Sequence, residues 1–290
     1  MDPKLQRRVQ RYGWDLASDD YEALWQAQLA GARSALLVHA APGTGERVLD
    51  VACGTGLVAF AAAHAVGPTG RVVGIDVSGR MIDAARARAE TRQMVNTDFL
   101  RMDAEQLALP DGAYDLALCA LGLMYLPSPE RALDEMRRVL RPGGRLGLVA
   151  WGARSRCGWS SLFPIVDAEV SSDVCPLFFQ LGQPNALANL CAAGQFENIE
   201  QHRIVATLNY ADADEACRAA FVGGPVALAW SRFDDAARQR VRSRYLESIS
   251  EWQHESGYRI PVEFIVVAGT APGATGSESK AMPVTVGNCI

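Results

Sequence analysis

Residues 50–56 read DVACGTG, a stretch that combines an acid with two glycines spaced one residue apart. It continues the apolar run 47–49, so Gly54 and Gly56 are expected to end a buried strand and open a helix. Glycine permits a tight turn and a close approach of the backbone to a ligand, and a helix N-terminus offers unpaired N–H groups. With Ala59 the stretch also satisfies G-x-G-x-x-G/A, a pattern that binds dinucleotides.

Further acids lie where the following strands are expected to end. Asp76 comes twenty residues after Gly56, where a carboxylate can accept hydrogen bonds from both ribose hydroxyls. Asp103 follows a third strand, where a carboxylate can meet an adenine amino group. Asp50 is polar at a position that a pyrophosphate-binding turn usually gives to an apolar residue. The glycine turn alone leaves NAD open, but Asp50 suits an adenosine ligand that carries a cationic amino-acid head.

An alternation of strand-like and helix-like segments between residues 46 and 151 must position these side chains. Ser78 is expected to cap one helix and Ser128 another, and RPGG (141–144) to end the second of these. The expected strands are 47–52, 71–76, 98–103, 114–122 and 145–151, and the expected helices are 57–66, the segment after Ser78, and 128–140. Strands separated by helices predict a parallel sheet with crossovers and a doubly wound α/β fold.

The outer segments differ in composition, because all six tryptophans lie before residue 41 or after residue 150. Residues 204–210 and 260–269 predict two late strands that complete a seven-stranded, mostly parallel sheet of the Rossmann-like type. Residues 234–256 predict an amphipathic helix with its apolar face formed by Val241, Tyr245, Ile249 and Trp252.

Composition narrows the classes of function. The chain has 290 residues and a net charge of -5 without a run of Lys or Arg, which gives no reason to expect nucleic acid as a partner. The N-terminal stretch lacks the apolar core of a secretory signal, and the most apolar segment, 57–66, is too short to span a membrane. Seven cysteines without CxxC or metal-ligand spacing predict reduced thiols, a cytoplasmic location and no metal site.

Four ordered motifs carry a resemblance to a known family: VLDVACGTG, VVGIDVSGRMI, MDAEQLALP and YDLALCALGLMYLPSPERALDEMRRVLRPGGRLGLVAW. In this order and spacing the chain is similar to the class I S-adenosylmethionine-dependent methyltransferases. It most resembles the small-molecule branch that includes the ubiquinone/menaquinone C-methyltransferases. The resemblance covers roughly residues 45–152.

The resemblance implies a cofactor site for S-adenosyl-L-methionine. Asp50, Ala52, Gly54, Thr55 and Gly56 would cradle the amino-acid part of the cofactor, and Asp76 would hold the ribose. Against the adenine the resemblance places Val77, Met81, Asp103 and Ala104, and against the methionine side it places Cys119, Ala120 and Leu121. The family often has glycine where Ala52 stands, a departure that concerns the local backbone angle.

The resemblance also implies the reaction and the organisation of the chain. A methyl group would move by in-line displacement to a carbon or oxygen of a small apolar or aromatic metabolite, as in secondary metabolism, without a metal. We expect a helical lid over residues 1–40, a cofactor-binding core over 41–152, an acceptor-pocket cap with the last strands over 153–269, and a flexible tail over 270–290. A monomer or a homodimer would suffice.

Aromatic residues of the outer segments are the candidates for the acceptor pocket. The rings of the N-terminal segment predict a lid that folds over the cofactor, and Arg154 offers a partner for an acceptor carboxylate. The predicted substrate-binding residues are Tyr12, Trp14, Trp25, Trp151, Arg154 and Trp159. Tyr21, Tyr125 and His202 are the candidates for a base that removes a proton from the acceptor.

Alternative functions stay open at this point. An NAD-dependent oxidoreductase would share the glycine turn but would not need Asp50. A non-catalytic protein on the same fold would bind the cofactor without turnover. An arsenite methyltransferase would need three converging thiolates, for which Cys53, Cys157 and either Cys175 or Cys217 are available.

Overall fold

The computed structural model describes residues 3–170 and 178–273 as an α/β protein built on one sheet. The strands are β1 (Arg47–Val51), β2 (Arg71–Asp76), β3 (Thr97–Arg101), β4 (Tyr114–Ala120), β5 (Leu140–Trp151), β6 (Glu197–Tyr210), β7 (Gln253–His254) and β8 (Gly257–Thr270). The α-helices are α1 (Pro3–Trp25), α2 (Ala30–Ala40), α3 (Leu57–Val66), α4 (Gly79–Thr91), α5 (Pro129–Val139), α6 (Leu162–Val170), α7 (Ala186–Ala193), α8 (Ala213–Phe221), α9 (Ala227–Arg232) and α10 (Asp235–Ser248).

The sheet has the order β3-β2-β1-β4-β5-β8-β6, with the short β7 paired to β8. The strands β1 to β5 run parallel to one another, and β8 runs antiparallel to both β5 and β6. On the central strand, Leu49 pairs with Val73 on one side and Ala117 on the other. This arrangement confirms the doubly wound, mostly parallel sheet expected from the alternation of segments.

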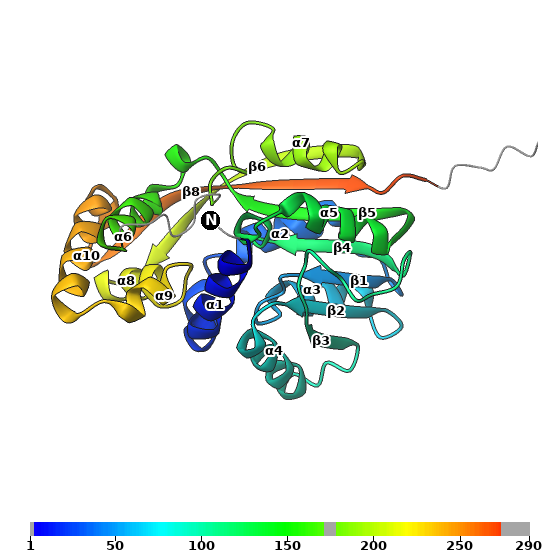
Figure 1. Cartoon of the computed structure of the whole chain (residues 1–290), viewed down its shortest axis with the longest axis horizontal. Coiled ribbons are helices and arrows are strands. Elements are labelled where there is room, and N and C mark those ends of the chain that lie inside the picture. The colour runs from blue at the N-terminus through cyan, green and yellow to red at the C-terminus, as the bar shows by residue number, and fades with distance from the viewer. Residues whose placement is uncertain (1–2, 171–177, 274–290) are drawn as a thin grey trace, which may run out of the picture.

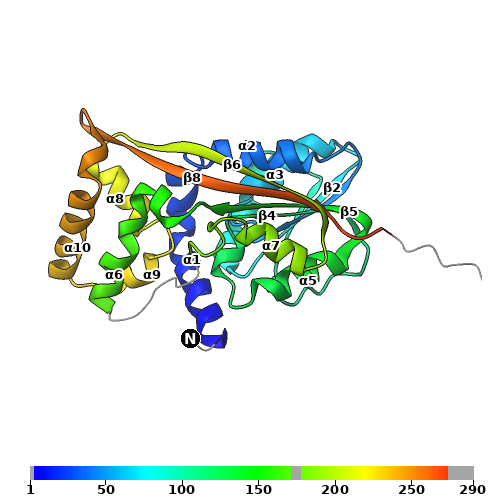
Figure 2. The same ribbon diagram turned by 90° about the horizontal axis from the view of Figure 1, so that it is seen from above.

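Helices cover both faces of the sheet, which is why its central strands are apolar throughout. Figure 2 shows α2 and α3 on one face and α5 and α7 on the other. Val48, Leu49, Leu116 and Leu118 are fully buried between these layers. The strand order reverses between β1 and β4, so the carboxyl ends of these strands form the crevice where such folds bind ligands.

The last two long strands connect this core to a second group of helices. β6 and β8 pair from Glu197–Thr270 to Tyr210–Tyr258 and run well past the parallel strands (Figure 1). The helices α6, α8, α9 and α10 lie beside this extended part of the two strands, and we call these four helices the cap. The cap therefore joins the core through an antiparallel ribbon and the segments that enter and leave it.

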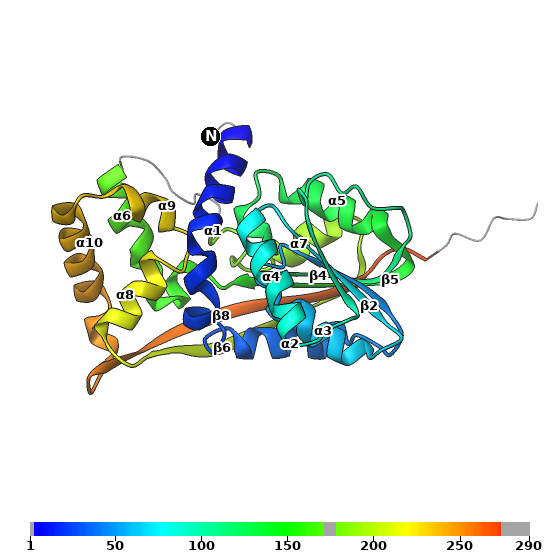
Figure 3. The ribbon, with the colours of Figure 1, turned by 90° about the horizontal axis from the view of Figure 1, so that it is seen from below.

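Helix α1 lies between the core and the cap (Figures 1 and 3). On the core side, Glu22 pairs with Arg88 and Arg92 of α4, at a distance of 2.9 Å for Arg92 Nη2. On the cap side, Asp20 pairs with Arg218 of α8 at 2.7 Å. The first helix is thus held by charged side chains to both parts of the chain.

The structure differs from the sequence-based expectations at three element ends. RPGG does not lie between a helix and a strand, because β5 already begins at Leu140 and contains it as an irregularity opposite Tyr114 and Leu116. The helix expected over 234–256 ends at Ser248, so Trp252 lies in a 3-10 turn (Ser250–Trp252). Ser128 precedes α5 but its side chain makes no cap hydrogen bond; Ser78, by contrast, accepts one from the Met81 N–H.

Two further findings concern the outer parts of the chain. Of the tail expected over 270–290, residues 274–290 lie outside the described residues. Within the described ranges, no helix has the length and apolar character needed to cross a lipid bilayer.

Candidate active site

The turn after β1 adopts a backbone conformation that explains its glycines. Ala52, Gly54 and Gly56 all have positive φ, of 55°, 54° and 90°. A Cβ on Gly56 would come within 2.8 Å of the Phe60 ring, whereas a Cβ on Gly54 would meet no atom within 4 Å. Gly54 therefore presents bare backbone to open space, as close approach by a ligand requires. Ala52 holds the left-handed conformation without being glycine, a strain that is typical of functional sites.

Asp76, at the end of β2, ties this turn to the start of α4. Its Oδ2 accepts a hydrogen bond of 2.9 Å from the Gly54 N–H, and its Oδ1 accepts one of 2.9 Å from the Ser78 N–H. Burial raises the pKa of Asp76 to about 6, although these two N–H groups pull it down. The carboxylate is therefore held rigidly at the carboxyl end of the sheet and is ionised above neutral pH.

Asp50, on β1, is a buried carboxyl group with an unused oxygen. Only 1% of the residue is exposed, and Oδ2 has no hydrogen-bond partner among the described residues. Burial raises the pKa of Asp50 to about 8, while the Ala59 N–H lowers it and Asp76 raises it further. A buried acceptor without a donor is costly unless a ligand supplies one. The side chain is therefore poised for a cationic or hydrogen-bond-donating group.

Arg33 of α2 is the complementary cation, and sequence reasoning missed it. Its Nη1 is buried without a hydrogen-bond partner among the described residues. Arg33 lines the same small cavity as Asp50, together with Gly54 and Tyr21. A buried guanidinium and a buried carboxyl group in one cavity match a zwitterionic amino-acid head. The signal available in the sequence was that Arg33 is the only Asp, Glu, Lys or Arg in the otherwise small and apolar helix α2.

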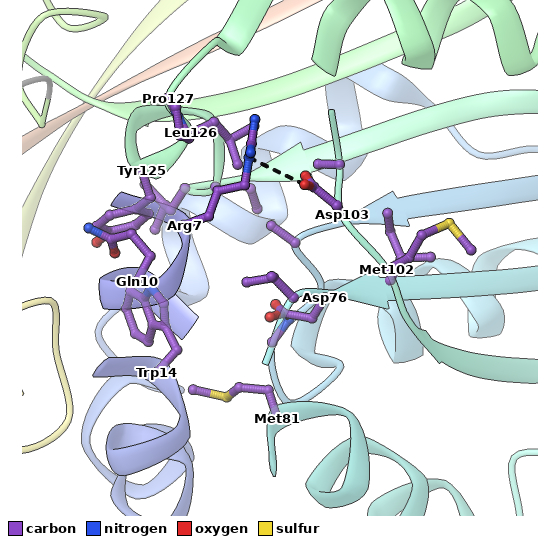
Figure 4. A pocket seen from close by; sticks show the side chains of 18 of the residues that line it. Arg7, Gln10, Trp14, Asp76, Met81, Met102, Asp103, Tyr125, Leu126 and Pro127 are labelled. Atoms are coloured by element: carbon purple, nitrogen blue, oxygen red, sulfur yellow. Dashed lines mark hydrogen bonds and ion pairs between the residues drawn. The ribbon is translucent and has the colours of Figure 1, made fainter. Parts of the chain in front are cut away.

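A larger pocket continues from this cavity along the ends of β2, β3 and β4. Figure 4 shows Asp76 and Asp103 in its wall, with Met81 and Met102 nearby. The two cavities bring together ten of the residues that the resemblance assigned to the cofactor: Asp50, Ala52, Gly54, Asp76, Val77, Met81, Asp103, Ala104, Ala120 and Leu121. Thr55, Gly56 and Cys119 support the turn and the strand end but do not line either cavity.

The remaining polar side chains near the turn are a buried hydroxyl group and two buried thiols. The Thr55 hydroxyl is fully buried and has no hydrogen-bond partner among the described residues. Burial raises the pKa of Cys119 to about 12, with Asp50 adding to the rise. Burial likewise raises the pKa of Cys53 well above the usual thiol value. These thiols are therefore protonated packing groups and not nucleophiles.

Helix α1 closes the outer side of the larger pocket. Arg7 pairs with Asp103, at 3.3 Å between Nε and Oδ2 (Figure 4). It also pairs with the buried Glu105. Nearer its middle, Asp15 Oδ1 accepts a hydrogen bond of 2.6 Å from the Ser78 hydroxyl, beside the N-terminus of α4. The helix thus contacts the pocket wall both at Asp103 and beside Ser78.

A small aromatic cavity adjoins the larger pocket on the side of the cap. Tyr21, Leu121 and Tyr125 line both cavities, so the two are neighbours. The aromatic cavity brings together six of the residues singled out in the sequence: Trp14, Tyr21, Trp25, Tyr125, Trp151 and Trp159. The rings pack edge to face, with centroids 5.0 Å apart for Trp151 and Trp159.

Three predicted site residues lie elsewhere. Tyr12 is 47% exposed on the outer side of α1, under the guanidinium of Arg11. Arg154 lines a separate surface groove. His202 stacks on the His39 ring with centroids 3.7 Å apart, on the antiparallel edge of the sheet. The fold therefore does not bring these three side chains to the cofactor cavities or to the aromatic cavity.

The thiols proposed for arsenic chemistry do not form a metal-binding group in the described structure. Burial raises the pKa of Cys157 and of Cys217 to about 11. Among residues 3–170 and 178–273, no three His, Cys, Asp or Glu side chains gather in a way that could hold a metal ion. Cys175 lies outside the described residues.

Comparisons with known proteins agree with the geometry of this site. Residues 48–144 match the model of a family described as a methyltransferase domain. The ubiquinone/menaquinone biosynthesis C-methyltransferase UbiE of Pseudomonas fluorescens (strain SBW25) is 39% identical over 136 residues, which are 46% of this chain and 49% of that protein. The chain thus matches about half the length of this relative, and the cap lies outside the family match.

Solved structures are similar over most of the chain. A methyltransferase structure described as putative, from Bacillus halodurans C-125, has a TM-score of 0.60 and 22% identity and covers 83% of this chain and 98% of that chain. Phosphoethanolamine N-methyltransferase 2 of Haemonchus contortus, solved with S-adenosyl-L-methionine, has a TM-score of 0.56 and 16% identity over 89% of this chain and 57% of that chain. At these identities the likeness concerns the fold.

Proposed function

We propose that the chain, which carries a methyltransferase domain similar to UbiE, is a class I S-adenosylmethionine-dependent enzyme that methylates a carbon or oxygen of a small apolar or aromatic metabolite. One observation carries the proposal most strongly. Asp50 and Arg33 place a buried, unpartnered carboxyl oxygen and a buried, unpartnered guanidinium nitrogen in one cavity among the described residues, next to the turn that Asp76 fixes. That combination fits the zwitterionic amino-acid head of S-adenosyl-L-methionine, whereas the carboxyl group of Asp50 beside Arg33 does not suit an anionic pyrophosphate.

The residues present fit each part of the cofactor. Asp50 would accept hydrogen bonds from the ammonium group, and Arg33 would donate to the carboxylate. Asp76 would accept from the ribose hydroxyls through the lone pairs that Gly54 and Ser78 leave free. The adenine would lie against Val77 and Met81, with Asp103 at its amino group.

The bound cofactor supplies a methyl group on a sulfonium, so the protein needs no nucleophile of its own. The tasks left to the chain are to align the acceptor and to exclude water. Leu121 and Tyr125 line both the large pocket and the aromatic cavity, so the reacting ends of the two molecules would meet beside them. The tryptophan rings of the aromatic cavity keep the acceptor side dry.

The choice of base limits the acceptors. Burial strongly raises the pKa of Tyr21, with Asp76 adding to the rise and Arg33 opposing it, so this phenol stays protonated near neutral pH. Tyr21 would therefore act as a hydrogen-bond donor and not as a base. His202 stacks on His39 and lines none of the three cavities, so it would not act as the base. An uncharged acceptor that is already nucleophilic, such as an electron-rich phenol or an enol, fits a site of this kind.

We further propose that α1 is the lid of the active site. Arg7, Asp15 and Trp14 contact or line the cofactor side, while Trp25 lines the aromatic cavity. Since α1 is tied to α4 and to α8, its seating would close both cavities together. Residues 1–40 would then act as one functional unit with the core.

A methyl-transfer screen tests the function. The full chain is incubated with S-adenosyl-L-methionine and a panel of ionisable phenols and enolisable ketones, and products are detected by a mass gain of one methyl group. We expect turnover of at least one panel member, and its loss in Asp76→Asn. Binding of S-adenosylhomocysteine without turnover of any member would support a non-catalytic binding protein instead.

A further inference from the structure

Two tryptophans that line the aromatic cavity have indole N–H groups for which no described residue supplies a hydrogen-bond acceptor. Trp25 and Trp159 are 5% and 2% exposed, and the indole nitrogen of each is buried without a hydrogen-bond partner among residues 3–170 and 178–273. Their ring centroids are 6.2 Å apart, so one small molecule can span both. Buried tryptophan N–H groups usually find an acceptor, and leaving one unpaired costs free energy. Two such donors in the wall of one cavity therefore point to a ligand with oxygen acceptors.

The charge of the cavity restricts that ligand. The described residues that line it include no Asp, Glu, Lys, Arg or His. A carboxylate entering such a cavity would lose its hydration without gaining a counter-ion, which is strongly unfavourable. Arg154, which the sequence suggested for an acceptor carboxylate, lies instead in a separate surface groove and over the Phe179 ring, 5.1 Å from its centroid. An uncharged oxygen is the acceptor that fits.

The space beside Trp25 supports the same assignment. A Cβ on Gly223 would lie 3.4 Å from Trp25 Nε1 and 2.8 Å from a Leu24 methyl group. Glycine at this position thus leaves the edge of the indole uncrowded. Gly224 and Pro225, which follow it, line the cavity, so the uncrowded edge lies close to the space that the acceptor would enter.

We propose that Trp25 and Trp159 donate their indole N–H groups to an uncharged, carbonyl-type oxygen of the acceptor and so select flat, apolar, enolisable ketones or esters. The carbon of the neutral enol would receive the methyl group, and the enol O–H would release its proton. The inference rests on the proposed function, because it assigns the molecule that receives the methyl group. A carbonyl oxygen has two lone pairs and can accept from one or both indoles. The surrounding rings pack on the flat apolar body, while Tyr125 and Leu121 mark the side from which the methyl group arrives. Trp25 ends α1, so closure of the lid would complete this binding site.

Binding of three matched probes to the full chain tests the inference. 2-Acetonaphthone carries a ketone oxygen, 2-ethylnaphthalene has a similar shape without oxygen, and 2-naphthoate carries a negative charge. With S-adenosylhomocysteine present, we expect the ketone to bind at least about 5-fold more tightly than either other probe. Equal binding of the ketone and the hydrocarbon, or tighter binding of the carboxylate, would overturn the assignment without any variant being needed.

Variants then locate the donors. Trp25→Phe and Trp159→Phe keep an aromatic ring but remove the N–H group, and each is expected to weaken ketone binding by about 2- to 10-fold relative to hydrocarbon binding. Trp151→Phe is the matched control, because Trp151 lines the same cavity but its nitrogen is not among the buried unpaired ones. It should change the binding of both probes equally. An unchanged ketone-to-hydrocarbon ratio in both donor variants would refute their role.

Binding of S-adenosylhomocysteine separates this inference from the proposed function. Neither Trp25 nor Trp159 lines the two cofactor cavities, so all three variants should bind it as the unaltered chain does. If the unaltered chain fails to bind S-adenosylhomocysteine, the proposed function fails, while the probe ratios measured without it still decide the role of the indoles.

Discussion

Replacing Asp50 by asparagine removes the buried charge that is assigned to the ammonium group while keeping the size of the side chain. Oδ2 of Asp50 has no hydrogen-bond partner among the described residues, and the pKa of the group is raised to about 8 by burial. We therefore expect Asp50→Asn to bind S-adenosylhomocysteine more weakly, by an amount that depends on pH.

The magnitude follows from two terms. A hydrogen bond to a charged group contributes about 1.5–3 kcal/mol, so above pH 8 the variant should bind roughly 10- to 150-fold more weakly. Below pH 8 the free protein carries Asp50 mostly protonated, and the ratio of the two dissociation constants should shrink by about tenfold per pH unit. The ligand's own titration cancels in that ratio, and the two proteins should bind almost alike near pH 6.

Isothermal titration calorimetry between pH 6 and pH 9 measures both dissociation constants. Asp98→Asn is the matched control, since Asp98 pairs with Arg71 at 2.6 Å on the exposed edge strand β3; it should leave the affinity unchanged at every pH. An affinity ratio for Asp50→Asn that stays constant across this range would refute the assignment of Asp50 to the cationic head.

Four further outcomes are expected. Folding raises the pKa of Asp50 from 3.8 to about 8, so the folded state favours the protonated carboxyl group. The stability that this group confers is therefore complete below pH 4 and is lost as the pH rises through 8. In scanning calorimetry, the melting temperature of the unaltered free protein should fall over this pH range more than that of Asp50→Asn. Arg33→Gln should weaken S-adenosylhomocysteine binding about 10- to 100-fold but leave binding of 5′-methylthioadenosine, which lacks the amino-acid head, unchanged in the same titration. Gly56→Ala, at a φ of 90° and 2.8 Å from the Phe60 ring, should cost about 1–3 kcal/mol in urea unfolding; an unchanged midpoint would contradict the turn geometry. Asp15→Ala, which removes the contact of α1 with Ser78, should raise the KM for the acceptor more than it lowers kcat in steady-state kinetics; an unchanged KM would contradict the role of α1 as the lid.

The core of the fold could be predicted from the sequence because local signals and tertiary packing agree there. The strand β2 and the helix α3 have the expected bounds, and the Ser78 cap forms as expected. The helix before residues 141–144 ends as expected, at Val139, but the strand expected to begin at residue 145 already begins at Leu140. Pairing of Leu140 with Tyr114 extends β5 through that stretch as an irregularity, and such pairing is decided by the neighbouring strand and not by local propensity.

The sequence could predict those site residues that share one turn or one strand end. It could not predict the residues whose position depends on how helices outside the core pack. Asp50, Asp76 and Asp103 lie at the ends of parallel strands, so their convergence follows from the topology. Arg33 reaches the cavity of Asp50 only because α2 packs on β4, β5 and β8, a placement that the single charged residue of this apolar helix does not by itself predict. His202 shows the converse, since its residue type suggested a base but its strand lies at the far edge of the sheet.

Competitive titration of the full chain with S-adenosylhomocysteine and NAD tests the central claim most directly. We predict that S-adenosylhomocysteine binds with one site per chain, raises the melting temperature, and is not displaced by excess NAD. Binding of NAD together with the absence of any heat or stabilisation from S-adenosylhomocysteine would contradict the account.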